Sequence, residues 1–156
     1  MTQTELVDAT DEAVIVSGVS EIPLAEAQRL VAMFAEATTA KDVERFLAGF
    51  TEDCVVHFGR FPVMRGKGQL RPFVATMFSP RLAHFVCRKT LRSVNGNVLG
   101  VTWTTEWRDA SSGKMKAGRG LEFWIMRGSR IARWDAAFNS WDRTEERQPG
   151  VATGVP

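Results

Sequence analysis

The chain is 156 residues long, with 44% hydrophobic and 24% charged residues, and its 20 basic and 18 acidic side chains leave a net charge of +2. This is the composition of a single globular domain, and the balanced charge argues against a nucleic-acid-binding surface. The sequence has no apolar stretch near the roughly 20 residues that span a bilayer and no signal-peptide core at its acidic N-terminus. We therefore expect a cytoplasmic protein that binds neither nucleic acid nor a membrane.

The two ends of the chain differ from its middle. Residues 1–19 are polar and largely aperiodic, and residues 143–156 are charged and then rich in Pro and Gly, which is typical of flexible segments. We expect an N-terminal arm over residues 1–19 and a disordered tail over residues 143–156. One domain is predicted between them, at residues 20–142.

Helical patterns come first within this domain. Ser20 and Pro23 predict the start of a helix whose apolar residues recur at helical spacing (Leu24, Ala27, Leu30, Val31 and Phe34). Thr39 and Asp42 resemble a capping box before a second short helix over residues 43–50. Residues 55–58 are β-prone, and a third helix is predicted over residues 66–78, with Pro72 near its first turn.

The pattern changes to period two after residue 82. Alternating runs at 83–94, 98–108, 115–127 and 130–139 are separated by Asn95-Gly96, by residues 111–113 and by Gly128-Ser129. Asn-Gly between β-prone runs is a strong hairpin signal, because both turn residues then take positive φ. The sequence predicts an α+β domain in which helices cover one face of a four-stranded antiparallel meander and leave a cone open at one end.

Residues 119–141 carry the most informative side chains. Three tryptophans (Trp124, Trp134 and Trp141) accompany Glu122 and Asp135 on two predicted strands. A carboxylate among large aromatic rings is typical of a small-molecule pocket. Desolvation disfavours the charged form of a carboxylic acid, so Glu122 would serve as a proton donor there. His57 would serve as the base if it faces the same cavity.

Three segments, FTEDCVV, MRGKGQLRPFV and GLEFW followed by RIARWDAAF, resemble the SnoaL-like branch of the nuclear transport factor 2-like superfamily. The resemblance covers residues 24–141. It implies the cone-shaped, cystatin-like fold, with three N-terminal helices packed on a curved antiparallel sheet. Relatives in this superfamily include ketosteroid isomerase, limonene epoxide hydrolase, scytalone dehydratase and polyketide cyclases, but the fold also hosts non-catalytic domains.

The resemblance also implies positions for the site. Glu122 falls where ketosteroid isomerases carry the carboxylic acid that donates to the oxyanion. The slot of the isomerase base falls at His57 or at Phe58, depending on a one-residue choice of register. The chain has no tyrosine for the second oxyanion donor, and Ala136 stands where limonene epoxide hydrolase has an aspartate. Neither mechanism transfers intact.

The final strand supplies further candidates. Strand alternation places Trp134, Ala136 and Phe138 toward the cavity and Arg133, Asp135 and Ala137 away from it. Glu106 either lines the pocket or faces solvent or a partner subunit. The predicted ligand-binding residues are Trp124, Trp134, Ala136, Phe138, Phe58, Phe73, Met77 and Glu106, with Glu122 and His57 as the catalytic pair.

Other residue patterns resemble a zinc site or a basic binding surface, and we expect neither. Cys54-x-x-His57 and His84-x-x-Cys87 have zinc-like spacing, but residues three apart on a strand point to opposite faces, so no metal site is predicted. We expect Arg65, Lys67, Arg71, Arg88, Lys89 and Arg92 to lie on solvated faces. Glu122 could instead pair with Arg119 or Arg108 in a purely structural role.

Two functional classes remain open. The first is a cofactor-independent isomerase, lyase or hydrolase that acts by acid-base chemistry on a small, largely apolar molecule. The second is a non-catalytic ligand-binding or homodimerisation module, in which the tryptophan-rich sheet supplies the interface.

Overall fold

The structure is a computed structural model and describes residues 22–145. The predicted arm at residues 1–19, Ser20, and all of the predicted tail except Arg143–Glu145 lie outside the described residues. The helices are α1 (Leu24–Thr39), α2 (Val43–Ala48) and α3 (Gly66–Met77). The strands are β1 (Phe50–Phe58), β2 (Met64–Arg65), β3 (Leu82–Asn95), β4 (Val98–Asp109), β5 (Met115–Arg127) and β6 (Arg130–Asp142), and a 3₁₀ turn follows at Arg143–Glu145.

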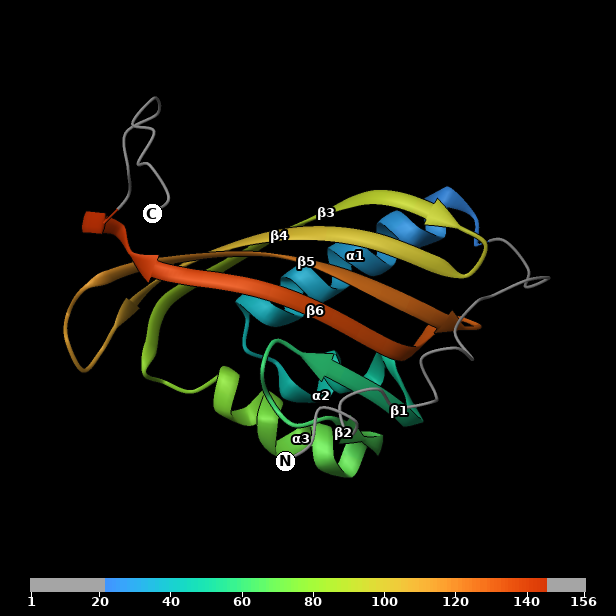
Figure 1. Cartoon of the computed structure of the whole chain (residues 1–156), viewed down its shortest axis with the longest axis horizontal. Coiled ribbons are helices and arrows are strands. Elements are labelled where there is room, and N and C mark those ends of the chain that lie inside the picture. The colour runs from blue at the N-terminus through green and yellow to red at the C-terminus, as the bar shows by residue number, and fades with distance from the viewer. Residues whose placement is uncertain (1–21, 146–156) are drawn as a thin grey trace, which may run out of the picture.

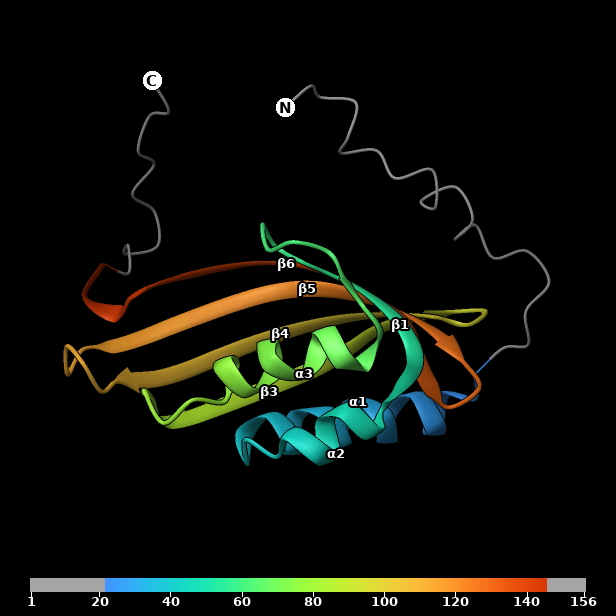
Figure 2. The same ribbon diagram turned by 90° about the horizontal axis from the view of Figure 1, so that it is seen from below.

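The strands form one six-stranded sheet in the order β2-β1-β6-β5-β4-β3. The predicted meander is confirmed, since β3 to β6 pair antiparallel in sequence order. The sheet is wider than predicted, because β1 adds in parallel to β6 and β2 adds antiparallel to β1. The helices pack on one face of this curved sheet, and the opposite face carries none of the described helices (Figures 1 and 2).

The predicted second helix is too long at its C-terminal end. It ends at Ala48, and Phe50 is the first residue of β1. Gly49 between them lies so close to the ring of Phe34 that an added Cβ atom would come within 2.2 Å of it. A residue without a side chain therefore lets the chain turn from helix to strand directly over the core.

Two local predictions about helix ends are also wrong. The side chain of Asp42 caps α2 by accepting a hydrogen bond from the Arg45 amide at 2.9 Å, whereas Thr39 ends α1 and its hydroxyl bonds to the backbone of Cys87. The third helix begins at Gly66 as predicted, but Pro72 lies in its interior rather than near its first turn.

The turn between β3 and β4 differs from the Asn-Gly prediction. Asn95 pairs with Val98 as the last residue of β3, so Gly96 and Asn97 form the two-residue turn. Gly96 has a φ of +58°, and Asn95 is not among the described residues with positive φ. Glycine at the first central position is typical of a type II′ turn, which suits the right-handed twist of the hairpin.

The core lies between the helices and the concave face of the sheet. Phe34 of α1 is 1% exposed, and its ring makes edge contacts with Phe46 of α2 and Phe50 of β1 and a tilted contact with Trp124 of β5. Aromatic contacts of this kind add to the free energy gained by removing the rings from water. Phe34 therefore joins both layers at the closed end of the domain.

We expect Phe34→Ala to lower the free energy of unfolding by roughly 3–5 kcal/mol, because it opens a cavity at this junction. Urea denaturation monitored by circular dichroism would measure the change. The matched control is Phe61→Ala, at a ring that is 47% exposed, for which about 1 kcal/mol or less is expected. Equal losses for the two variants would contradict this placement of the core.

Candidate functional site

A cavity of about 300 Å³ lies between the concave face of the sheet and the helices. Its walls are mainly aromatic, with rings contributed by α2, α3 and the segments around them and by β1, β3, β4 and β6. These rings are Phe46, Phe58, Phe61, Phe73, Phe78, Phe85, Trp103, Trp107, Trp134 and Phe138. Such a volume with mostly apolar walls and a few polar groups suits a small organic molecule.

Glycines on β5 create the hollow. Gly118 and Gly120 occupy inward-facing positions of β5, opposite Thr105 and Trp103 of β4. An added Cβ at Gly120 would come within 2.5 Å of the Trp103 ring, and one at Gly118 would lie 3.5 Å from the Trp107 ring. With no side chain at Gly120, the indole ring of Trp103 can lie across β5 and form part of the cavity wall, whereas a Cβ at Gly118 would make an ordinary contact with Trp107 and a close one, at 2.9 Å, with the Thr105 hydroxyl.

Glu122 is the carboxylate of this cavity. Its side chain is fully buried, and its two oxygens accept from different donors: Oε1 from Lys89 Nζ at 2.5 Å and Oε2 from Trp134 Nε1 at 2.9 Å. Each donor comes from a different strand, so three strands hold one carboxylate. A buried charge of this kind is tolerated only when it is paired and hydrogen-bonded.

Lys89 is the partner of Glu122, and the expectation that it lies on a solvated face is wrong. Its side chain is 6% exposed. Alternation along β3 places Lys89 on the inward face, beside Trp103 of β4. Its Nζ lies 5.8 Å from the ring centroid of Trp103 and 5.6 Å from that of Trp124. The two rings and the carboxylate together stabilise an ammonium in an otherwise apolar site.

The cavity opens where its lining residues become exposed. Phe61 is 47% exposed and Phe138 is 40% exposed, and Asn139 and Ser140 near the end of β6 are also exposed. These residues come from the β1–β2 connection and from the second half of β6. We call this opening the mouth of the cavity.

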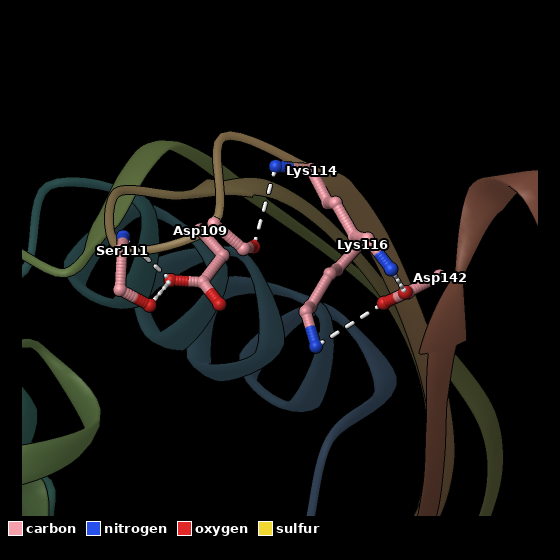
Figure 3. A network of polar contacts seen from close by, with 6 residues as sticks. Asp109, Ser111, Lys114, Lys116 and Asp142 are labelled. Carbon is pink, nitrogen blue, oxygen red and sulfur yellow. Dashed lines mark hydrogen bonds and ion pairs between the residues drawn. The ribbon is translucent and has the colours of Figure 1, made fainter.

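A polar network fixes the strands next to the mouth (Figure 3). Asp142, two residues after Ser140, accepts from Lys114 at 2.8 Å and forms an ion pair with Lys116 at 3.2 Å. Hydrogen bonds from these two lysines lower the pKa of Asp142. In the adjoining turn, the hydroxyl and the amide of Ser111 both donate to Asp109 and hold the pKa of its carboxyl at about 2. Both carboxylates are therefore charged at neutral pH; Asp142 of β6 holds the start of β5, and Asp109 at the end of β4 holds the turn that leads into β5.

Cys87 also lines the cavity. Burial raises the pKa of its thiol to about 11. A thiol is a weak nucleophile while it is protonated. At neutral pH Cys87 therefore acts as a small apolar wall residue, and Lys89 and Glu122 are the ionisable groups beside it in the cavity wall.

The structure brings most of the predicted site residues together. Glu122, Phe58, Phe73, Met77, Trp134 and Phe138 all line the cavity. Ala136 lies on the same inward face of β6, directly beside Glu122 in the strand pairing, and packs against the core. It does not contribute to the cavity wall.

Trp124 and Glu106 lie elsewhere. Trp124 is 1% exposed and packs against Phe34 in the core. Its ring contacts the ammonium of Lys89 and does not line the cavity. Glu106 points to the outer face of β4, where it lies 3.7 Å from Arg143. The tryptophan-rich face of this strand is thus the inner one, and Glu106 cannot contact a molecule in the cavity.

His57 also lies on the outer side of the sheet. It pairs with Asp135 of β6, whereas its neighbour Phe58 pairs with Ala136 and lines the cavity. The register left open by the sequence is therefore the one that turns Phe58 inward. His57 Nε2 is buried without a hydrogen-bond partner among residues 22–145. In this geometry His57 cannot act as a base opposite Glu122.

No group of three or more metal-binding side chains occurs within residues 22–145. Cys54 is buried on the inward face of β1, whereas His57 faces outward. Within the same described part of the chain, no helix is long and apolar enough to cross a membrane.

Sequence reasoning missed Lys89, Trp103 and Trp107. The alternation of Leu99, Val101, Trp103, Thr105 and Trp107 along β4 could have indicated one inward face. Lys89 gave a weaker signal, since it stands between the apolar residues Cys87 and Leu91 at period two. Its pairing with Glu122, which is 33 residues away in the sequence, follows no local pattern.

The comparisons with known proteins agree with this architecture. A model of the SnoaL-like domain matches residues 30–134, which include both members of the buried ion pair. The chain belongs to the SnoaL-like family. This places it in the nuclear transport factor 2-like superfamily, as the sequence motifs predicted. No curated protein sequence matches this SnoaL-like chain significantly.

Solved structures share the fold of this SnoaL-like protein at low sequence identity. A putative polyketide cyclase from Xanthomonas campestris is 19% identical, with a TM-score of 0.61 over 72% of this chain and 89% of that chain. The epoxide hydrolase/cyclase-like enzyme SalBIII, described in pyran ring formation in the polyether salinomycin, is 13% identical, with a TM-score of 0.64 over 74% and 92%. A putative scytalone dehydratase from Novosphingobium aromaticivorans is 11% identical, with a TM-score of 0.63 over 85% and 95%.

We expect Lys89→Met to lower the free energy of unfolding by roughly 3–5 kcal/mol at neutral pH, because it leaves the Glu122 carboxylate buried without its cation. Glu122→Gln should also destabilise, since it strands the ammonium. The double variant Lys89→Met/Glu122→Gln removes both charges and should recover roughly 1–3 kcal/mol relative to the sum of the single changes.

The matched control for this double-mutant cycle is the exposed pair Arg71 and Glu44, whose side chains are 50% and 74% exposed. Arg71→Met and Glu44→Gln should couple by less than about 1 kcal/mol. Additive effects at Lys89 and Glu122 in denaturant titrations would show that the two side chains are not paired in solution.

Proposed function

We propose that this SnoaL-like protein binds a small, largely apolar molecule in the cavity and converts it by acid-base chemistry, as a cofactor-independent isomerase, lyase or hydrolase. The observation that carries this proposal is the buried Lys89–Glu122 pair in the wall of an aromatic cavity. A folded domain gains little from such a pair, since apolar residues of the same volume stabilise a core as well or better. A role toward a ligand explains its presence.

The two side chains suit complementary roles. Both oxygens of Glu122 already accept hydrogen bonds, so before any reaction Glu122 is the proton acceptor of the pair, whereas the sequence predicted a proton donor. The donor is Lys89, because an ammonium has three N–H bonds and only one is needed for Glu122. A charged donor in a site that excludes water stabilises negative charge that develops on an oxygen atom during a reaction.

The relatives support this class of chemistry. The names of the similar structures describe a polyketide cyclase, an epoxide hydrolase/cyclase-like enzyme and a scytalone dehydratase, all of which denote enzymes that act on small organic molecules. At these identities they support the fold alone.

A ligand with one oxygen atom tests the proposed role of Lys89. We expect 2-naphthol to bind about tenfold more tightly than naphthalene, because its oxygen accepts a hydrogen bond from Lys89 within an apolar cavity. Quenching of tryptophan fluorescence measures both affinities, since Trp103, Trp107 and Trp134 line the cavity. Lys89→Met should remove the preference and keep the binding of naphthalene.

Two serine variants test whether the ligands bind in the cavity. Ser140→Trp places a large ring at the mouth and should weaken both ligands, whereas Ser129→Trp in the exposed β5–β6 turn should leave both affinities unchanged. Equal binding of 2-naphthol and naphthalene by the unaltered protein would contradict the role of Lys89. Unchanged binding by Ser140→Trp would contradict the location.

A homodimerisation role is supported by the outer face of the sheet. Leu121 is 62% exposed and Phe123 is 56% exposed there, and they follow each other on the outward side of β5. Two large apolar side chains side by side on a sheet face are typical of a protein interface. We infer a homodimer through this face, with the cavities of the two subunits pointing away from it. We also propose that the protein is cytoplasmic, as the sequence predicts.

Phe123→Asp should therefore convert a dimer into a monomer at micromolar concentration, because a carboxylate in the centre of the interface would lose its hydration. Sedimentation velocity measures the mass. The control is Leu24→Asp, at a side chain that is 61% exposed at the start of α1, which should leave the dimer intact. A monomeric unaltered protein at this concentration would contradict the dimer.

A further inference from the structure

We propose that Lys89 forms a Schiff base with carbonyl compounds that enter the cavity, and that Glu122 transfers the protons that this reaction needs. The inference rests on the proposed function, since it uses the same cavity, and it names the substrate class as small apolar aldehydes and ketones. It adds a covalent step to the acid-base role of the pair.

The position of Lys89 meets the first requirement for an amine nucleophile. Its side chain lines the cavity and is 6% exposed, so it is withdrawn from bulk water but reaches the space that a ligand would occupy. Lysines that form Schiff bases in proteins lie in sites shielded from water, next to the carbonyl compound they bind. The exposed lysine Lys114, whose side chain is 60% exposed, lacks this environment.

Glu122 meets the second requirement, a group that takes the proton from the ammonium. The 2.5 Å between Lys89 Nζ and Glu122 Oε1 is a single hydrogen bond. An apolar ligand that fills the cavity excludes water and disfavours separated charges around the pair. Transfer of one proton from Nζ to Oε1 then gives a neutral amine beside a neutral carboxylic acid, with no net change in charge.

The reaction balances with these two groups alone. The nitrogen lone pair attacks the carbonyl carbon, and the C=O π electrons move to oxygen. Glu122 gives its proton to that oxygen and takes one from nitrogen, which forms the neutral carbinolamine. Glu122 then protonates the hydroxyl group, which leaves as water while the nitrogen lone pair forms the C=N bond. The products are an iminium ion on Lys89, a carboxylate on Glu122 and one water molecule.

The surrounding residues suit the product. An iminium ion keeps the positive charge on the nitrogen of Lys89. An ion pair with the Glu122 carboxylate therefore remains after the reaction, as in the unmodified protein. Trp134 continues to hold the second oxygen of Glu122 at 2.9 Å. The thiol of Cys87 does not compete for the carbonyl carbon, because burial raises its pKa to about 11 and keeps it protonated.

Reductive trapping tests the inference. The full chain is incubated with 2-naphthaldehyde and sodium cyanoborohydride, and peptide mass spectrometry locates the stable secondary amine, which adds the mass of the aldehyde less one oxygen atom. We expect Lys89 to be modified at least about tenfold faster than Lys114, because binding raises the effective concentration of the aldehyde at Lys89. Lys89→Arg should lose this rapid modification, and Lys114→Arg should keep it.

Glu122→Gln separates proton transfer from binding. It keeps the shape of the side chain but cannot take a proton, so trapping at Lys89 should fall by roughly 10²-fold. Binding of 2-naphthalenemethanol, which has no carbonyl group, is measured in Glu122→Gln and in Lys89→Arg by tryptophan fluorescence, so that trapping rates are compared at equal occupancy of the cavity. Circular dichroism shows that each variant is folded.

The outcomes distinguish the two proposals. If 2-naphthalenemethanol binds but Lys89 and Lys114 are trapped at equal rates, the Schiff base is overturned and the binding function stands. If neither naphthalene compound binds, the proposed function fails and the covalent step fails with it. Trapping at Lys89 that is unaffected by Glu122→Gln would overturn the role of Glu122.

Discussion

One buried ion pair constrains the rest of this structure. A carboxylate and an ammonium in an apolar interior are stable only when each is held by the other and by further donors or rings. Here β3 supplies Lys89, β5 supplies Glu122 and β6 supplies Trp134. The register of the whole meander must therefore be correct before the charges can be buried, and a shift by one residue would turn every one of these side chains to the opposite face.

The fold provides the apolar surroundings that make the pair useful. The curved sheet and the helices enclose a cavity whose walls are aromatic, and Gly120 on β5 leaves space for the indole ring of Trp103 on β4. The closed end is filled by rings around Phe34, while the other end opens beside the strands tied together by Asp142 (Figure 3). A molecule that enters at the mouth therefore meets mostly carbon surfaces and one pair of charges.

Much of the fold was predictable from the sequence because it follows local rules. Period-two alternation and glycine turns indicated the meander, and alternation along the final strand correctly turned Trp134 and Phe138 inward. The parallel pairing of β1 with β6 was not predictable, because nothing within β1 specifies a distant partner strand. The same limit applies to the site. Glu122 lies among aromatic neighbours that the sequence already showed, but Lys89 looked like any strand lysine, and His57 was misplaced because the sequence left the register of β1 open by one residue.

The most direct test of this account is the rate at which the ammonium protons of Lys89 exchange with water. Nuclear magnetic resonance of protein with ¹⁵N-labelled lysine side chains should show a slowly exchanging Lys89 signal at neutral pH, because the group is buried and bonded to Glu122, and this signal should be lost in Glu122→Gln. Exchange as fast as that of Lys114 in the unaltered protein would mean that Lys89 is solvated, and would contradict the buried pair on which the proposed site depends.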